Sequence, residues 1–321
     1  MSDLVATDPS GFPAPRAART PRLLRDRSGS QRVTNIELFF DLVYVFAVTQ
    51  LSHHLLDNPT VRGALQTGLL LAMVWLLWVY TTWVTNWLDP EQLEVRLLLI
   101  ALMLVSLAMS AALPRAFGDL GLLVGGAYAV QQIGRTSFMV VALRGHPLQA
   151  NFERIMAWCV VSGALALAGG FAHGSARALL WVLAVGVDLV GPAVGFYTPW
   201  LGRSAYHFIH PVMVAGIIVT AAADQEVLSR PAATASTASA WMILGGPALF
   251  LAGHAAFKLV VWRYVSWSRL AGIVVLALLA LVARTLPELA LAACAAAVVA
   301  AVAAADRLPG LPHPRRELAP S

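Results

Sequence analysis

Long apolar stretches, each about 20 residues in length, follow one another along almost the entire chain and restrict the folds open to it. A helix needs about 20 apolar residues to cross the roughly 30 Å hydrocarbon core of a bilayer. Only 12% of the residues are charged, which is about half the usual share in a soluble domain. The sequence therefore predicts an all-α fold, a polytopic transmembrane helical bundle surrounded by the lipid bilayer.

We expect about ten spans between two polar tails. Residues 1–35 are rich in Pro, Ala, Ser and Arg, a composition that cannot bury a core, so this tail is expected to be disordered. The transmembrane helical domain covers residues 36–305, and residues 306–321 form a short C-terminal tail. The predicted spans are 36–56, 63–84, 94–113, 117–143, 154–172, 177–199, 205–223, 241–260, 267–284 and 286–305, with a polar loop at 224–240.

Basic residues between the spans orient the bundle, because cytoplasmic loops of membrane proteins are enriched in Lys and Arg. With a cytoplasmic N-terminus, most of the 22 Lys and Arg residues lie on the cytoplasmic side. We therefore expect an even number of spans and both termini in the cytoplasm. Since the basic residues lie between apolar stretches, no nucleic-acid partner is expected despite the net charge of +5. The opposite side then holds Arg62, Arg115, Arg177, Arg230 and Arg284, and Arg135 lies within a span.

The first span carries two acids, Glu37 and Asp41. Thr34 and Glu37 have the spacing of a capping box, which gives Glu37 a structural role as one explanation and leaves a site role as the other. Asp41 lies about 8 Å into the span, where a carboxylate has to face protein or water. Arg135 is expected at a similar depth and is its natural partner. An ion pair that only fixes packing and a functional site are both compatible with this pattern.

Two further polar residues lie inside apolar stretches. Asp188 is near the middle of the span 177–199, four residues before Pro192, which removes a backbone donor and can kink the helix. A broken helix beside an acid is typical of transporter sites, and a hydrogen-bonded Asp at a simple kink is the alternative. His254 is either a packing residue or part of the same site. The candidate substrate- or ion-binding residues are therefore Asp41, Glu37, Arg135, Asp188 and His254.

Other chemistry finds little support in the sequence. Cys159 and Cys294 are isolated in apolar stretches, and His207 and His210 lack the further ligands that a metal would need. The sequence contains no metallopeptidase, serine-hydrolase or nucleotide-binding motif. We therefore expect no metal, no cofactor and no enzymatic activity.

Pairs of glycines spaced four residues apart permit helices to approach closely in a membrane. Gly121 with Gly125 and Gly191 with Gly195 have this spacing. We expect close helix contacts at both pairs.

Several segments resemble motifs of one protein family. Residues 37–46 (ELFFDLVYVF), followed by 50–53 (QLSH), resemble the opening signature of the bacterial low temperature requirement protein A family. Residues 83–89 and the run 128–135, which ends in QQIGR, resemble later motifs of that family. Residues 210–218 and 245–254 are similar to its C-terminal half. The resemblance covers most of residues 32 to 305.

This resemblance implies a multi-pass protein of the bacterial cytoplasmic (inner) membrane. Family members carry a central segment similar to HxxERxxLFxIIxLGE and then a Trp-rich span, whereas this chain passes directly from Ser204 to Ala205. The chain therefore resembles a shortened member that lacks about two central spans. Losing an even number of spans keeps the orientation of the C-terminal half.

Two functions are compatible with these observations. One is a transporter or carrier for an unknown small solute or ion, with an intramembrane carboxylate/Arg site. The other is a non-transporting membrane sensor, receptor-like or assembly protein involved in stress or low-temperature growth. The sequence leaves the oligomeric state open.

Overall fold

The computed structural model describes residues 22–25, 34–195 and 207–306. Over these residues the chain is helical, with two isolated β-bridges and no strand, which confirms the all-α prediction. The α-helices are α1 (Asn35–Asp57), α2 (Val61–Thr85), α3 (Leu93–Ala112), α4 (Gly121–Ala142), α5 (Gln149–Phe171), α6 (Gly174–Val190), α7 (His210–Ser229), α8 (Thr237–Trp262), α9 (Trp267–Leu279) and α10 (Glu288–Ala305).

Seven of these helices are long and apolar enough to cross a membrane, namely α1, α2, α3, α5, α7, α8 and α10. Helix α4 is long enough to cross a membrane, with 22 residues. It is less apolar than the seven, because Gln131, Gln132 and Arg135 lie within it. Helix α6 has 17 residues and continues into a π-helix, Gly191–Gly195. Helix α9 has 13 residues, about 20 Å. The multi-span helical membrane fold is confirmed, and the number of about ten spans stays a prediction.

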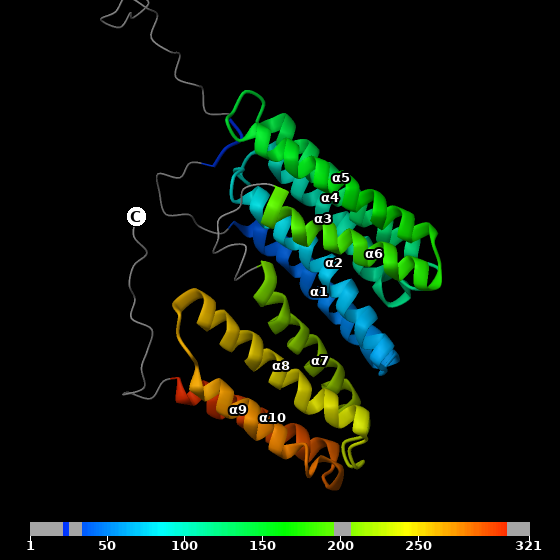
Figure 1. Cartoon of the computed structure of the whole chain (residues 1–321), viewed down its shortest axis with the longest axis vertical. Coiled ribbons are helices and arrows are strands. Elements are labelled where there is room, and N and C mark those ends of the chain that lie inside the picture. The colour runs from blue at the N-terminus through cyan, green and yellow to red at the C-terminus, as the bar shows by residue number, and fades with distance from the viewer. Residues whose placement is uncertain (1–21, 26–33, 196–206, 307–321) are drawn as a thin grey trace, which may run out of the picture.

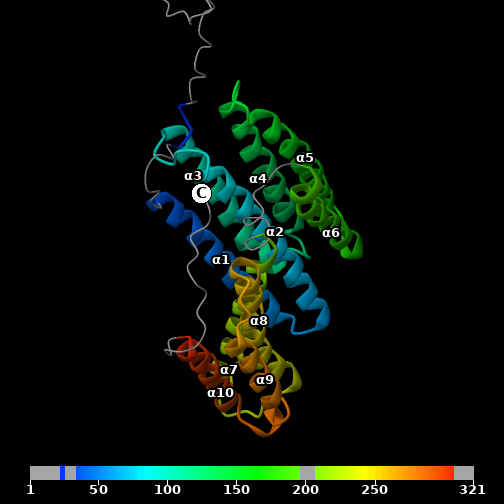
Figure 2. The same ribbon diagram turned by 60° about the vertical axis from the view of Figure 1, so that its left-hand side comes forward.

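The helices form two groups (Figures 1 and 2). Helices α1 to α6 surround one hydrophobic core, and α7 to α10 surround a second. Helix α7 packs on α1 and α2 and contributes Ile218 and Ala222 to the first core. It also contributes Ala223 and Val227 to the second core. Helix α7 is therefore the element that joins the two groups.

The end of α7 and part of the N-terminal tail differ from the prediction. Helix α7 continues to Ser229, beyond the expected end at residue 223, because the polar residues there extend the helix by an ion pair between Glu226 and Arg230 at i, i+4. Residues 22–25 belong to the tail expected to be disordered, yet they pair with the α2–α3 loop through Arg25 N to Trp87 O and Asp89 N to Leu23 O, both 2.9 Å. For these four residues the expectation of disorder does not hold.

Close helix contact at Gly121 and Gly125 is confirmed. A Cβ atom at Gly125 would overlap the carbonyl oxygen of Ala166 on α5, and one at Gly121 would overlap the Arg177 guanidinium. Gly195 of the second pair lies against the Trp158 ring of α5. The spacing of small residues therefore places α4 and α5 in direct backbone contact.

Candidate functional site

Asp188 lies fully buried on α6, at 0% exposure. Its Oδ2 atom accepts hydrogen bonds from the Tyr128 hydroxyl and from Gln132 Nε2, both on α4. The Tyr80 hydroxyl of α2 donates to the backbone carbonyl of Asp188 at 3.0 Å. Helices α2 and α4 therefore both hydrogen-bond to Asp188 of α6, α4 at the carboxylate and α2 at the backbone carbonyl. We call Tyr80, Tyr128, Gln132, Arg135 and Asp188 the Asp188 network.

Pro192 explains why a tyrosine hydroxyl reaches the Asp188 carbonyl. In a regular α-helix the N–H of residue 192 would donate to the carbonyl of residue 188. Proline has no N–H, and in a bilayer a freed carbonyl has to find another donor within the protein. Tyr80 supplies that donor. The predicted proline kink is therefore observed as a local change of helix type, from α-helix to the π-helix Gly191–Gly195.

Arg135 is 1% exposed and has three kinds of partner. Its Nη2 atom donates to Gln132 Oε1. Its Nη1 atom donates to the Leu77 carbonyl at 3.2 Å and to the Thr81 hydroxyl at 3.1 Å. The guanidinium carbon lies 5.3 Å from the centroid of the Tyr80 ring. The Arg135 charge is thus satisfied by oxygens of α2 and α4 and by an aromatic face.

The two buried charges are bridged and not in direct contact. Gln132 accepts from Arg135 through Oε1 and donates to Asp188 through Nε2. These two bonds also fix the orientation of the amide, since only Oε1 can accept and only Nε2 can donate. Asp188 and Arg135 therefore balance each other's charge through a neutral side chain.

A second set of polar contacts connects α4 with α3 and α1. Gln131 Oε1 accepts from the Ser106 hydroxyl of α3 at 2.7 Å. The Tyr44 hydroxyl of α1 lies 3.4 Å from the same Ser106 oxygen. Gln131 thus connects α4 with α3 and α1. The neighbouring Gln132 connects α4 with α6 and, through Arg135, with α2.

The expected pair of Asp41 with Arg135 is wrong. Asp41 is exposed on α1, and its Oδ1 accepts from Trp78 Nε1 of α2 at 2.8 Å. The packed face of α1 contains Phe40 and Ala47, at 3% and 1% exposure. Adjacent helical residues point about 100° apart, so Asp41 lies beside that face and not on it. The hydrogen bonds of Arg135 to Leu77, Thr81 and Gln132 are made instead on α2 and α4.

Glu37 has the capping role that the sequence offered as one explanation. The Thr34 N–H and hydroxyl donate to Glu37 Oε2 at 2.8 and 3.0 Å. Arg25 Nη2 adds an ion pair, at 3.2 Å from Oε1 and 3.3 Å from Oε2. Glu37 therefore caps the N-terminal end of α1 and binds Arg25 of the N-terminal segment. It does not belong to the Asp188 network.

His254 lies on α8, which packs on α7, α9 and α10. Its ring contacts Phe250, with centroids 6.0 Å apart. The second helix group therefore holds His254 away from the Asp188 network. Of the five candidate residues, the structure brings together only Arg135 and Asp188.

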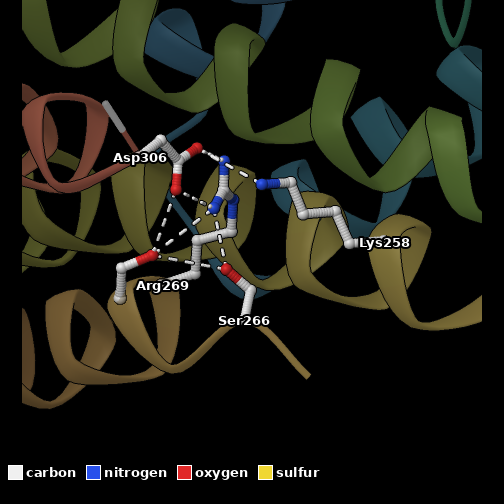
Figure 3. A network of polar contacts seen from close by, with 5 residues as sticks. Lys258, Ser266, Arg269 and Asp306 are labelled. Atoms are coloured by element: carbon white, nitrogen blue, oxygen red, sulfur yellow. Dashed lines mark hydrogen bonds and ion pairs between the residues drawn. The ribbon is translucent and has the colours of Figure 1, made fainter. Parts of the chain in front are cut away.

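An ionic cluster lies at the ends of α8 and α10 and the start of α9 (Figure 3). Asp306 accepts from Arg269 Nη2 at 2.6 Å and from Lys258 Nζ at 3.2 Å. Arg269 Nη1 also donates to Asp306 Oδ1 and to the Ser266 hydroxyl, at 3.0 and 2.7 Å. The hydrogen bonds from Arg269 hold the pKa of the Asp306 carboxyl well below its ordinary value. This cluster fixes the end of α10.

Four residues that contribute to this arrangement were not predicted from the sequence, namely Tyr80, Thr81, Tyr128 and Gln132. A signal for two of them was present, because Tyr128, Gln132 and Arg135 follow i, i+4, i+7 and so lie on one face of α4. A polar stripe within an otherwise apolar helix marks the face turned toward the bundle interior.

Comparison with known proteins identifies the family of the chain. The family model described as bacterial low temperature requirement A protein (LtrA) matches residues 32–204 and 196–304. The chain belongs to the LtrA family. The two matched segments meet at 196–204, beside the junction of Ser204 and Ala205, which itself lies outside the described residues.

The chain is also similar to "Uncharacterized protein RA0937" of Rhizobium meliloti (strain 1021), with 39% identity over 184 residues. That match covers 57% of this LtrA-family chain and 45% of the relative, so it spans less than half of the relative's length. No solved structure matches the chain.

Proposed function

We propose that this LtrA-family protein is a carrier that moves a small solute or ion across the bacterial inner membrane, with Asp188, Gln132 and Arg135 as its binding site. The main observation in support of this proposal is that Gln132 bridges the two buried charges. Charged side chains inside a membrane are costly and mark substrate or ion pathways. A pair that served packing alone would gain most from direct bidentate contact. Here Gln132 keeps the charges apart, so each can exchange partners.

The broken helix beside Asp188 supports this proposal. Helix α6 ends at Val190, two residues after Asp188, and the π-helix Gly191–Gly195 with Pro192 follows. Interrupted helices next to charged residues form the binding sites of many carriers, and π-turns occur often at functional sites. The backbone next to Asp188 is therefore the part of the bundle best suited to change conformation during transport.

Charge displacement in reconstituted bilayers tests the proposal. Proteoliposomes on a solid-supported membrane would receive concentration jumps of H⁺, Na⁺, K⁺, chloride, phosphate and amino acids. We expect a current for at least one of them that Asp188→Asn reduces by about tenfold or more, as for loss of a binding interaction of at least about 1.4 kcal/mol. Asp41→Asn, the same carboxylate-to-amide change outside the network, is expected to keep the current. The proposal fails if no current depends on Asp188.

One observation favours the alternative, a non-transporting membrane sensor, receptor-like or assembly protein. The charged and amide members of the network are 0–1% exposed, and the cavities lined by Trp241, by Arg96 and by Asp224 have other side chains in their walls. Under this alternative the network only holds α2, α4 and α6 together. Asp188→Asn would then lower the melting temperature and leave every solute response of the remaining folded protein unchanged.

A further inference from the structure

We infer that the ion bound at Asp188 is a proton and not a metal cation. The inference rests on the proposed carrier function and names the ion that its site takes. It follows from the direction of the hydrogen bonds, from the uncoordinated carboxylate oxygen and from the charges that face Asp188.

The side chains around the Asp188 carboxylate present donors to it. Tyr128 and Gln132 both direct hydrogen atoms at Oδ2. The only side-chain oxygen of Gln132 already accepts from Arg135, and the Tyr80 hydroxyl donates to the Asp188 carbonyl. Alkali and alkaline-earth cations need several oxygen acceptors, about six for a typical site. Within the described part of the chain, no cluster of three or more His, Cys, Asp or Glu side chains could hold a metal.

A proton needs only one free oxygen, and Asp188 has one. Its Oδ1 is buried and makes no hydrogen bond. The Ser162 hydroxyl of α5 lies within hydrogen-bonding reach of the carboxylate, and it donates to the Cys159 carbonyl at 3.3 Å. When a proton from water binds Oδ1, the new O–H can donate to the Ser162 oxygen, whose lone pairs are available.

Protonation changes the charge of the network from zero to +1. The carboxylate loses its negative charge, and Arg135 keeps its positive charge, because arginine stays protonated in proteins. The remaining charge is held by the Leu77 carbonyl, the Thr81 hydroxyl and the Tyr80 ring. The Gln132 amide then bridges a cation to a neutral acid. Because Gln132 and Arg135 lie on α4 and Asp188 lies on α6, this change of charge links proton binding to the contact between the two helices.

Asp188 is the group among its neighbours that can take up a proton as the pH falls below neutral. Tyrosine and cysteine ordinarily titrate above neutral pH, and arginine stays charged. The titratable or charged side chains that face Asp188 are Tyr80 of α2, Tyr128 and Arg135 of α4, and Cys159 of α5.

Infrared difference spectra of the full-length protein in lipid bilayers test this inference without any transported solute. Spectra would be recorded at acidic and alkaline pH, in sodium-free buffer and in buffer containing sodium chloride. We expect a carboxylic-acid C=O band at acidic pH that Asp188→Asn abolishes and Asp41→Asn keeps. The band's pH dependence should be the same with and without sodium.

Two results would overturn the proton site. One is a band that survives in Asp188→Asn, and the other is a sodium-dependent shift of the Asp188 carboxylate bands at constant alkaline pH. If Asp188→Asn does not fold, Asp188→Glu retains a carboxyl group and must move the band to a new frequency; an unmoved band also overturns the inference. If no current depends on Asp188, the carrier function is contradicted and the spectra remain interpretable.

Discussion

Arg177 is the clearest case of a residue whose role came from its surroundings. The sequence placed it on the outer side, at the first residue of the predicted span 177–199, whereas it is 2% exposed and its guanidinium lies 5.7 Å from the Trp181 ring centroid. Carbonyl groups at helix C-terminal ends carry partial negative charge, so they can hold a buried cation in place of an acid. The carbonyls that accept from it are those of Ala116, Gly118, Gly169, Gly170 and Ala172.

Arg177→Lys is expected to destabilise the protein although it keeps the charge. Lysine has three donors at one point and cannot reach carbonyls on both sides, whereas hydrogen bonds to a charged group contribute about 1.5–3 kcal/mol each. We expect a loss of about 3 kcal/mol, measured as a lower melting temperature in detergent. Arg115→Lys is the matched control, because the Arg115 ion pair with Asp119 is 64% and 60% exposed and such exposed pairs contribute little to stability. Equal effects of the two substitutions would contradict this account.

At the scale of elements, neighbouring glycines of α8 separate the effect of packing from that of helix propensity. A Cβ at Gly246 would lie 2.5 Å from Thr220 Oγ1 and 2.7 Å from Thr220 N on α7, whereas one at Gly245 meets no atom within 4 Å. Helices α7 and α8 therefore touch through backbone at Gly246. Sequence spacing gave no reason to distinguish the two residues.

Gly246→Ala is expected to lower the free energy of unfolding by about 1–3 kcal/mol, since overpacking forces α7 and α8 apart. Gly245→Ala should instead stabilise by up to about 1 kcal/mol, because alanine favours the helix. Thermal unfolding of both variants in the same detergent measures the difference. A Gly246→Ala variant as stable as Gly245→Ala would show that the α7–α8 contact is looser than described.

Helix α10 depends on the Asp306 ion pairs, and this dependence has a pH signature. Since the folded-state pKa of Asp306 is lowered, its stabilising effect is complete above the unfolded value of about 3.9 and is lost as pH falls through the folded value. We expect Asp306→Asn to cost at most about 1 kcal/mol at neutral pH, because the Asp306 side chain is 34% exposed.

The difference in melting temperature between Asp306→Asn and the wild type should stay constant from neutral pH down to about pH 4 and shrink below it. Melting curves across this range measure it, and Asp119→Asn, in an exposed pair, serves as control. A difference that already disappears at neutral pH would mean that Arg269 and Lys258 do not hold the carboxylate.

At the scale of the whole molecule, contacts between loops show how the helices alternate. At one end, residues 22–25 pair with the α2–α3 loop, and Lys258 at the end of α8 meets Asp306 after α10. At the other end, Arg177 holds the α3–α4 connection, and an isolated bridge joins Thr234 to Pro287. The bias of basic residues toward the first end predicts that this end faces the cytoplasm.

Cysteine labelling tests this orientation. In a variant with Cys159 and Cys294 replaced by alanine, Arg284→Cys should react in intact cells with a maleimide that cannot cross membranes. Arg144→Cys should react only after the cells are opened, because it lies in the α4–α5 connection on the cytoplasmic side. The reverse pattern would invert the topology. Reaction of both sites in intact cells would mean that these helices do not alternate across the bilayer.

The sequence by itself determined the properties that are local. Apolar runs predicted α1 and α2 to within about two residues of Asn35–Asp57 and Val61–Thr85. The Thr34–Glu37 spacing offered a cap as one explanation for Glu37, and Asp188 and Arg135 were recognised as candidate site residues within apolar stretches. Each of these follows from length, composition or spacing within one helix, because the bilayer demands apolar residues and internal hydrogen bonding at every span.

Only the tertiary structure decided which groups meet. The rotation of a helix about its own axis is set by packing against helices distant in sequence, and a change of about 100° separates a buried residue from its exposed neighbour. For this reason Asp41 meets Trp78 and not Arg135, and Gln132 stands between the two buried charges. The charges could be identified from the chain; the amide that links them and the carbonyls that hold Arg177 could not.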